Sequence, residues 1–271
     1  MKKHYTSIIS QGFGKFASTA FPKPLQSLIN NSYVKLMGLD MSEFAQPSSY
    51  PTLNRLFTRA LVTPRMIIED DDIMISPVDA LVTDFGTITQ KRAYQIKGMA
   101  YSIQELLGDH HQHLLQDLEG GTFVNLYLSP KDYHRYHSPS HLKIQSLTHI
   151  PGKLYPVNFP LLRNMPNLFI ENERVIIECE DRQGRSFVMA LIGALNVGKM
   201  LITFESNIRT NSDIREPQHY AYENLWLDKG ELFGWFEMGS TILLFSQKDS
   251  FLPEVAINQN VKFAQPIGVI K

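Results

Sequence analysis

From Pro64 to its C-terminus the sequence alternates between short β-prone runs and turn residues, and this alternation restricts the chain to a β-rich fold. The runs are bounded by Gly, Pro, Asn, Asp or Ser at fairly regular intervals. They include ALVTDFGTIT, GTFVNLYLSP, HLKIQSLTHIPG, RVIIECEDRQG, SFVMALIGALNVG and STILLFSQ. Short strands with turns at this spacing are typical of an antiparallel sandwich or barrel.

The residues before this region favour helices. A helix is predicted over about 24–37, because Pro24 suits a first helical turn and Gly38 suits the position after the last one. Its apolar residues recur at helical spacing and are Leu25, Leu28, Ile29, Tyr33, Leu36 and Met37. This face either packs on a core or lies in a membrane interface.

Two further helices are predicted from apolar spacing and capping residues. The first lies near 51–61, with Ser48 or Ser49 as its cap. The second is a short helix that begins after Ser102, because Ser102 and Glu105 have the spacing of a capping box. We therefore predict an α+β chain with a predominantly antiparallel, sandwich- or barrel-like core and N-terminal helices.

The predicted elements divide the 271 residues into a helical region, 1–62, and a β-rich domain, 63–271. The net charge of -1 makes nucleic acid an unfavourable partner. Residues 1–39 nevertheless contain five lysines and no Asp or Glu. A cationic segment with interspersed apolar residues suits an anionic membrane surface, although a solvated arm fits the charge equally well. No apolar stretch reaches the roughly 18 to 20 residues that span a bilayer.

Two features of the sequence favour structural interpretations. Cys179 is the single cysteine, so it forms no internal disulfide, and its strand-like surroundings favour a structural role over a nucleophile. The loop histidines His110, His111 and His113 lack the Cys or carboxylate spacing of a metal site and are expected to be solvated. We predict no metal.

Reactive side chains combine with tight turns in three segments: SPVDA at 76–80, YLSPKDYHRYHSP at 127–139 and FEMGSTILLF at 236–245. In the third, Gly239 and Ser240 precede a dense apolar run. Glycine at such a position indicates close backbone approach or a simple turn. An esterase nucleophile elbow requires glycine two residues after the serine, where this chain has Ile242.

The other two segments supply proton-transfer groups. His134 and His137 lie three residues apart, so on a strand or irregular loop their rings point in different directions and suit different tasks. Asp79 follows Ser-Pro in a turn. It either bonds its own backbone or orients a histidine beside a serine.

Together these segments resemble the phosphatidylserine decarboxylase family, the prokaryotic-type pyruvoyl enzymes. The resemblance runs from about residue 50 to the C-terminus. It rests on the ordered motifs SPVDA, IKGMAYSIQELLG, YLSPKDYHRYHSP, PGKLYPVN, NLFIENERV, GALNVG and FEMGST. Two positions depart from the family pattern. Met238 replaces leucine, which nearly conserves volume. Ala80 replaces a glycine and would cost about 1 kcal/mol if its φ were positive.

The resemblance implies self-cleavage between Gly239 and Ser240 by a triad of Asp79, His137 and Ser240. His137 would act as base toward the Ser240 hydroxyl, which attacks the Gly239 carbonyl. An ester, then dehydroalanine, then a pyruvoyl group would follow, and chains 1–239 and 240–271 would result. The covalent pyruvoyl group made from Ser240 is the implied cofactor.

The resemblance also implies the reaction and its setting. The pyruvoyl group would decarboxylate phosphatidylserine to phosphatidylethanolamine and carbon dioxide through a Schiff base. His134 is the candidate for reprotonating the product. The enzyme would lie peripherally on the cytoplasmic side of a bacterial cell membrane, docked by its N-terminal residues, and would form a homodimer.

Three other functions remain as alternatives. A serine hydrolase would use the same Asp, His and Ser but keep an intact chain. A non-catalytic lipid-binding homologue would keep a free Ser240. A pyruvoyl decarboxylase for a soluble amino acid would act without lipid.

Overall fold

The computed structural model of the chain describes residues 5–96, 98–195, 199–237 and 240–271. The fold is mixed α+β, and every ladder between its named strands is antiparallel. The predicted fold class, a mainly antiparallel core with N-terminal helices, is therefore confirmed. The sheets within the described residues remain open and form no closed barrel.

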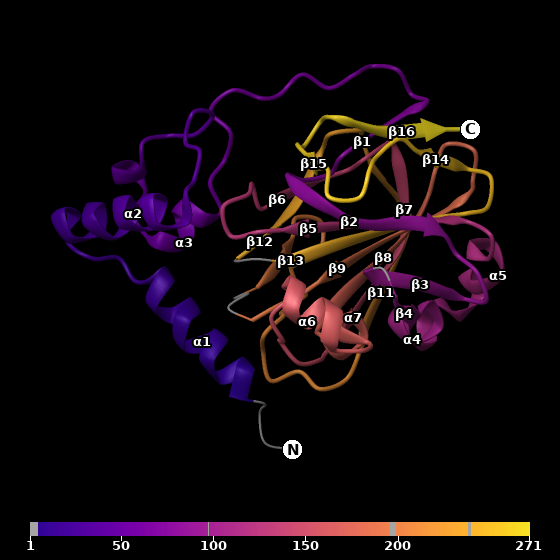
Figure 1. The fold of residues 1–271 in the computed structure, drawn as a ribbon, viewed down its shortest axis with the longest axis horizontal. Coiled ribbons are helices and arrows are strands. Elements are labelled where there is room, and N and C mark those ends of the chain that lie inside the picture. Colours follow the sequence, from indigo (N-terminus) through magenta and orange to yellow (C-terminus); the bar gives the residue numbers. More distant parts are fainter. Residues whose placement is uncertain (1–4, 97, 196–198, 238–239) are drawn as a thin grey trace.

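The helical elements gather at the N-terminus and along one face of the β-rich body (Figure 1). They are α1 Tyr5–Ser18, α2 Lys23–Met37, η1 Pro47–Ser49, α3 Leu53–Phe57, α4 Ile103–Leu107, η2 Asp109–Leu114, α5 Leu115–Leu118, α6 Phe159–Asn164 and α7 Leu168–Glu171.

The strands form one large sheet and three smaller ones. The large sheet has the order β11-β7-β8-β9-β13-β5-β2-β15, and the smaller ones are β10-β12-β6, β1-β16-β14 and β3-β4. The strands are β1 Ile73–Ile75, β2 Ala80–Thr87, β3 Arg92–Ile96, β4 Met99–Ser102, β5 Thr122–Leu128, β6 Arg135–His137, β7 Leu142–Ile150, β8 Arg174–Glu180, β9 Ser186–Ile192, β10 Met200–Ile202, β11 Gln218–Leu227, β12 Leu232–Phe236, β13 Ser240–Ser246, β14 Phe251–Pro253, β15 Asn260–Val261 and β16 Pro266–Ile270.

Strand β13 lies inside the large sheet, hydrogen-bonded to β5 on one side and β9 on the other. Its apolar run is buried on both faces, because Ile242 and Leu244 belong to one hydrophobic cluster and Leu243 and Phe245 to another. The first cluster lies between the large sheet and the two three-stranded sheets. The second lies under α4, α6, α7 and the β3-β4 hairpin. The continuous apolar sequence of this strand follows from burial on both faces.

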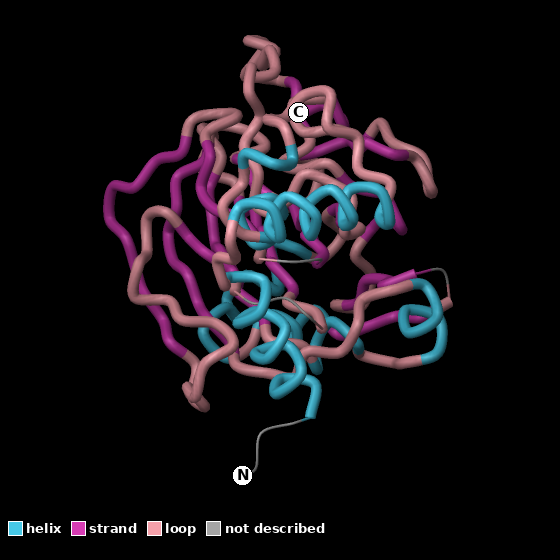
Figure 2. Tube along the Cα trace, turned by 90° about the vertical axis from the view of Figure 1, so that its left-hand side faces the viewer, coloured by secondary structure: helices cyan, strands magenta, loops and turns pink. Residues whose placement is uncertain are grey.

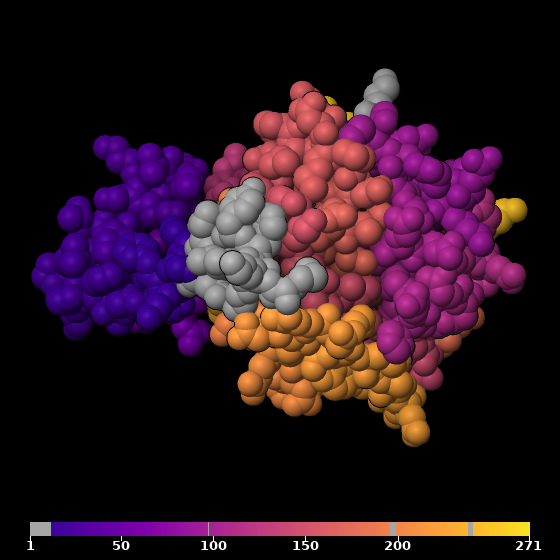
Figure 3. Space-filling view, turned by 90° about the horizontal axis from the view of Figure 1, so that it is seen from below, coloured from indigo at the N-terminus to yellow at the C-terminus, as the bar shows by residue number. Residues whose placement is uncertain are grey.

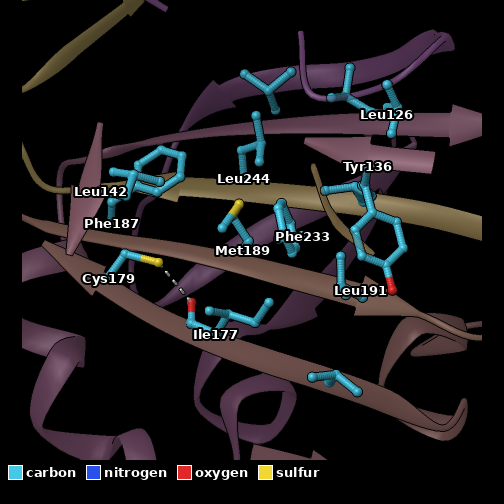
Figure 4. Packing of buried hydrophobic residues seen from close by; sticks show 14 of the residues in the cluster. Leu126, Tyr136, Leu142, Ile177, Cys179, Phe187, Met189, Leu191, Phe233 and Leu244 are labelled. Carbon is cyan, nitrogen blue, oxygen red and sulfur yellow. Dashed lines mark hydrogen bonds between the residues drawn. The ribbon is translucent and has the colours of Figure 1, made fainter. Parts of the chain in front are cut away.

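Cys179 lies in the first cluster, where its Sγ is 3.8 Å from the Ile177 carbonyl oxygen (Figure 4). Burial raises the pKa of the Cys179 thiol well above its ordinary value, so the reactive thiolate is disfavoured. The expected structural role of this cysteine agrees with its surroundings.

The N-terminal helices form a separate lobe beside the β-rich body (Figures 1 and 3). A small core of Tyr33, Leu53, Leu56 and Phe57 holds α2 and α3 together. Figure 2 shows these helices from the side, in front of the strands. Helix α2 matches the predicted 24–37 closely and ends at Gly38, whose φ of 65° is the left-handed cap that glycine favours.

The other predicted helices require corrections. Helix α3 is much shorter than the predicted 51–61, and Thr52 rather than Ser48 or Ser49 caps it, because the Thr52 hydroxyl accepts from the Arg55 amide. Helix α1 was not predicted. The Ser102 cap is confirmed, since the Ser102 hydroxyl accepts from the Glu105 amide.

The histidine loop is less exposed than the sequence suggested. His111 is fully buried, and its ring lies 3.1 Å from the Glu178 carboxylate and 2.8 Å from the Thr148 hydroxyl. Its expected solvation is therefore wrong, because the loop folds as η2 and α5 against β7 and β8. Among the described residues, no three His, Cys, Asp or Glu are placed to hold a metal ion.

Candidate active site

The strands around the Gly-Ser sequence bring the predicted motifs together. The Phe236 amide at the end of β12 donates to the His134 carbonyl at 2.9 Å, and β12 pairs with β6. Ser240 begins β13 and pairs with Leu128 of β5. The segments before and after the expected cleavage point therefore lie against the two ends of the histidine motif. Gly239 lies outside the described residues, as does the side chain of Ser240.

His137 is held by hydrogen bonds at both ring nitrogens. Its Nδ1 lies 2.9 Å from the Gly230 carbonyl oxygen, and its Nε2 lies 3.0 Å from the Tyr133 hydroxyl. A carbonyl only accepts, so we assign the proton to Nδ1 and the lone pair to Nε2. Burial lowers the pKa of His137 to about 4, with the Gly230 hydrogen bond opposing the shift. The ring is therefore a neutral base at pH 7.

His134 has a different environment. Its Nδ1 donates to the Asp132 carbonyl at 2.8 Å, its ring centroid lies 4.1 Å from that of Phe57, and its buried Nε2 has no hydrogen-bond partner. Burial lowers the pKa of His134 to about 3. The two Nε2 lone pairs thus have different surroundings, as the spacing of the histidines suggested: that of His137 accepts from Tyr133, and that of His134 has no partner. The Nε2 of His134 is available to a ligand proton.

Asp79 lies in the turn before β2, but it is not hydrogen-bonded to His137. Its carboxylate accepts two hydrogen bonds from Arg65 and a third, at 2.7 Å, from the Phe263 amide. The Phe263 ring stacks on the His137 imidazole with 3.7 Å between centroids. Asp79 is therefore connected to His137 only through Phe263, and its charge favours the imidazolium through space. Ala80 has no positive φ, so its replacement of glycine causes no backbone strain.

Three residues at this site were not identified from the sequence. Arg65 holds Asp79 and also the Glu43 carboxylate, at 2.8 Å. Tyr133 contacts His137, and burial raises its pKa to about 12, so its hydroxyl stays protonated. Arg59 is buried beside the His134 segment. Tyr133 stood inside the histidine motif, whereas the two arginines gave no local signal because their partners are distant in sequence.

The chain matches the family model for phosphatidylserine decarboxylase over residues 53–269. The chain is a member of the phosphatidylserine decarboxylase family. The phosphatidylserine decarboxylase proenzyme of Campylobacter jejuni is 43% identical over 96% of this chain and 97% of its own length. The proenzyme of Helicobacter pylori is 43% identical over 97% of both chains. That of Marinobacter nauticus is 33% identical over 96% of this chain and 92% of its own.

Family membership confirms the resemblance read from the motifs, and with it a carboxy-lyase made as a proenzyme that acts through a covalent pyruvoyl group. The residues present fit such a group at position 240. Nε2 of the buried His134 has no hydrogen-bond partner and can carry a proton to or from such a group.

The described part of the chain contains no helix that is both long and apolar enough to cross a membrane.

Proposed function

We propose that this chain cleaves itself between Gly239 and Ser240 and then decarboxylates phosphatidylserine with the pyruvoyl group formed from Ser240. The observation that carries the proposal is the pair of buried, neutral histidines from one short segment, each with its Nε2 lone pair in a different environment. Self-processing and turnover each need one proton carrier, and the two histidines supply them separately.

His137 serves the self-cleavage. Its Nε2 receives the proton of the Ser240 hydroxyl by way of the Tyr133 hydroxyl, which already donates to Nε2, as the Ser240 oxygen attacks the Gly239 carbonyl. The C–O bond of an ester replaces the C–N bond of the amide, and the proton passes to the departing nitrogen. Loss of the Ser240 α-proton then breaks the ester, and water releases ammonia. Asp79 supports the charge that develops on the imidazole through space, and its hydrogen bond to the Phe263 amide holds the residue whose ring stacks on His137.

His134 serves the turnover. The pyruvoyl group supplies an electron sink for the pair of electrons that carbon dioxide leaves behind. Nε2 of His134 accepts a proton from the ammonium group of the lipid and returns it to the carbon that has lost carbon dioxide. The Phe57 ring against His134 helps to exclude bulk water from this transfer.

The separation of these roles has a direct test. His137→Ala should leave a single uncleaved chain, whereas His134→Ala should yield both chains but little decarboxylation of phosphatidylserine. A gel and a carbon dioxide assay on the same preparations distinguish them. The reverse pattern would exchange the two assignments, and cleavage in both variants with full turnover would reject them.

The membrane-facing surface is proposed to be the outer side of the N-terminal lobe. Helix α2 buries a polar stripe, since Asn30 donates to the carbonyls of Pro47 and Tyr50 at 2.9 Å. Its leucines point outward instead, with Leu28 63% and Leu36 82% exposed. A helix with polar residues facing inward and leucines facing outward is suited to an apolar environment on its outer side.

Exposed cations complete this surface, because Lys15, Lys23 and Lys35 flank its apolar residues. Their charge favours an anionic bilayer such as one that contains phosphatidylserine. We place the enzyme on the cytoplasmic side of a bacterial cell membrane and assign docking to the 1–62 region and catalysis to 63–271. Protease added to spheroplasts should leave the chain intact. Digestion of the chain would place the enzyme on the outer side of the membrane.

A homodimer is also proposed. Strand β11 is an edge of the large sheet and carries Trp226, which is 45% exposed. An unpaired edge with an exposed aromatic residue favours pairing with a second copy. Sedimentation of the detergent-solubilised enzyme should give twice the mass of one 1–271 chain, and Trp226→Glu should shift the sedimenting mass toward that of the monomer. A monomeric wild-type enzyme would contradict the proposal.

A further inference from the structure

Arg59 is a buried cation without a carboxylate partner among the described residues. Its side chain follows α3 and is only 2% exposed. Its Nη2 donates to the carbonyl oxygens of Lys131 at 2.7 Å and Asp132 at 3.2 Å, while Nε and Nη1 have no hydrogen-bond partner. Its Cζ also lies 4.4 Å from the centroid of the Phe44 ring, but this cation–π contact and two carbonyl acceptors replace only part of the lost hydration, so burying the guanidinium costs folding free energy. Its place in the fold therefore calls for a functional explanation.

The explanation lies in the Asp132 carbonyl, which accepts from Arg59 and also from Nδ1 of His134 at 2.8 Å. The cation and the imidazole are thus joined through one oxygen atom. Phe57, two residues before Arg59, packs on the same imidazole ring. The end of α3 therefore supplies both a cation and an aromatic ring to His134.

Other charged side chains near His134 are directed elsewhere. The Asp132 carboxylate accepts from the Ser129 amide at 2.7 Å, and the Arg135 guanidinium donates to the Thr58 carbonyl at 3.0 Å. The charge of Arg59 acts on the imidazole and opposes its protonation. Arg59 is therefore the cation best placed to decide the protonation state of His134.

We propose that Arg59 is a positioning residue for His134. It fixes the carbonyl that holds the proton on Nδ1, which leaves the lone pair on Nε2, and its charge keeps the ring neutral until a substrate proton arrives. This inference rests on the proposed role of His134 in turnover. It also links the N-terminal lobe, which we assign to membrane docking, to the reacting atoms.

Two substitutions separate the charge of Arg59 from its hydrogen bonds. Arg59→Gln keeps a donor and removes the charge, whereas Arg59→Lys keeps the charge and loses the forked geometry. Arg55→Gln is the matched control, because Arg55 is an exposed arginine of α3, the helix that Arg59 follows. Each variant is used as the full chain, and only fully processed enzyme is assayed on phosphatidylserine in detergent micelles.

We expect Arg59→Gln to lower kcat roughly tenfold with little change in KM, and to move the acid limb of the pH–kcat profile up by roughly one unit. Arg59→Lys should lower kcat but keep the limb at its wild-type position, and Arg55→Gln should match the wild type. An unmoved limb in Arg59→Gln, or an upward shift in Arg59→Lys, would overturn the proposal. If Arg59→Gln fails to fold, the lysine variant decides alone.

A second measurement does not depend on the catalytic role of His134. Side-chain ¹⁵N shifts of His134, read in the uncleaved Ser240→Ala chain, report which ring nitrogen carries the proton. The Nδ1–H form should dominate, and adding Arg59→Gln should mix the two tautomers. An unchanged Nδ1–H signal would contradict the positioning role. Full turnover in His134→Ala would instead reject the role of His134 alone.

Discussion

The Tyr133 hydroxyl lies 3.0 Å from Nε2 of His137, the nitrogen that we assign as the base for self-cleavage. Because the opposite nitrogen donates to the Gly230 carbonyl, the Tyr133 hydroxyl donates to Nε2. The imidazole is therefore fixed at both ends before Ser240 is engaged. This arrangement makes Tyr133 a part of the processing machinery that the sequence pattern alone did not assign.

Tyr133→Phe should slow self-cleavage by roughly tenfold, because the hydroxyl that orients Nε2 and passes the Ser240 proton to it is lost. The time course of processing after cell-free synthesis measures the effect on a gel. Tyr101→Phe is the matched control, since the Tyr101 hydroxyl is equally buried but has no hydrogen-bond partner. Equal processing rates in the two variants would remove Tyr133 from the account.

Arg65→Met should destabilise the uncleaved Ser240→Ala chain by about 1 to 3 kcal/mol, because Asp79 would keep a largely buried charge with only the Phe263 amide as partner. Denaturant unfolding measures the loss. Lys262→Met is the control, since Lys262 contacts Glu43 from a side chain that is 62% exposed. A loss for Arg65→Met as small as that of the control would show that Asp79 does not depend on Arg65.

The buried histidines should make folding stability depend on pH. The folded pKa of His137 is about 4 and that of His134 about 3, both below the ordinary 6.5. The unfolded chain therefore binds protons first, and the stabilisation present above pH 6.5 is lost as the pH falls from 6.5 toward 4 for His137 and toward 3 for His134. Each ring contributes a slope of up to about 1.4 kcal/mol per pH unit.

His137→Asn in the Ser240→Ala background should flatten this slope by about 1 kcal/mol per pH unit between pH 6 and pH 5. Urea unfolding at several pH values provides the comparison. A slope equal to that of the parent chain would mean that His137 is protonated equally in the folded and unfolded states.

Leu28→Ser combined with Leu36→Ser should weaken binding to vesicles that contain phosphatidylserine by at least tenfold, since two exposed leucines are removed from the proposed contact. The matched control replaces Leu252 and Ile257, which are similarly exposed in the C-terminal part of the chain. Vesicle sedimentation measures binding. Equal losses in the two double variants would place the contact outside α2.

The sequence predicted those features that depend on local patterns. Helix α2 with its Gly38 cap, the Ser102 cap and the antiparallel strands each follow from spacing within a few residues. The short α3 differs because tertiary contacts, rather than apolar spacing, end it near Arg59. His111 was misjudged because its partner Glu178 is distant in sequence and becomes a neighbour only when η2 packs on the sheet.

The same distinction applies to the site. Asp79 and the two histidines were identified as types of residue with suitable chemistry, yet the expected direct contact between Asp79 and His137 was replaced by Phe263 and Arg65. Neither Phe263 nor Arg65 belongs to a motif that the sequence pattern identified. Such residues become visible only when the fold brings segments from both ends of the chain together.

The intact mass of the purified protein tests the central claim most directly. We predict two chains, 1–239 and 240–271, with the smaller one lighter by one ammonia than a simple hydrolytic fragment and with no free amine at its first residue. A single mass of 31.0 kDa would contradict self-cleavage. A small chain that begins with an unmodified serine would contradict formation of the pyruvoyl group.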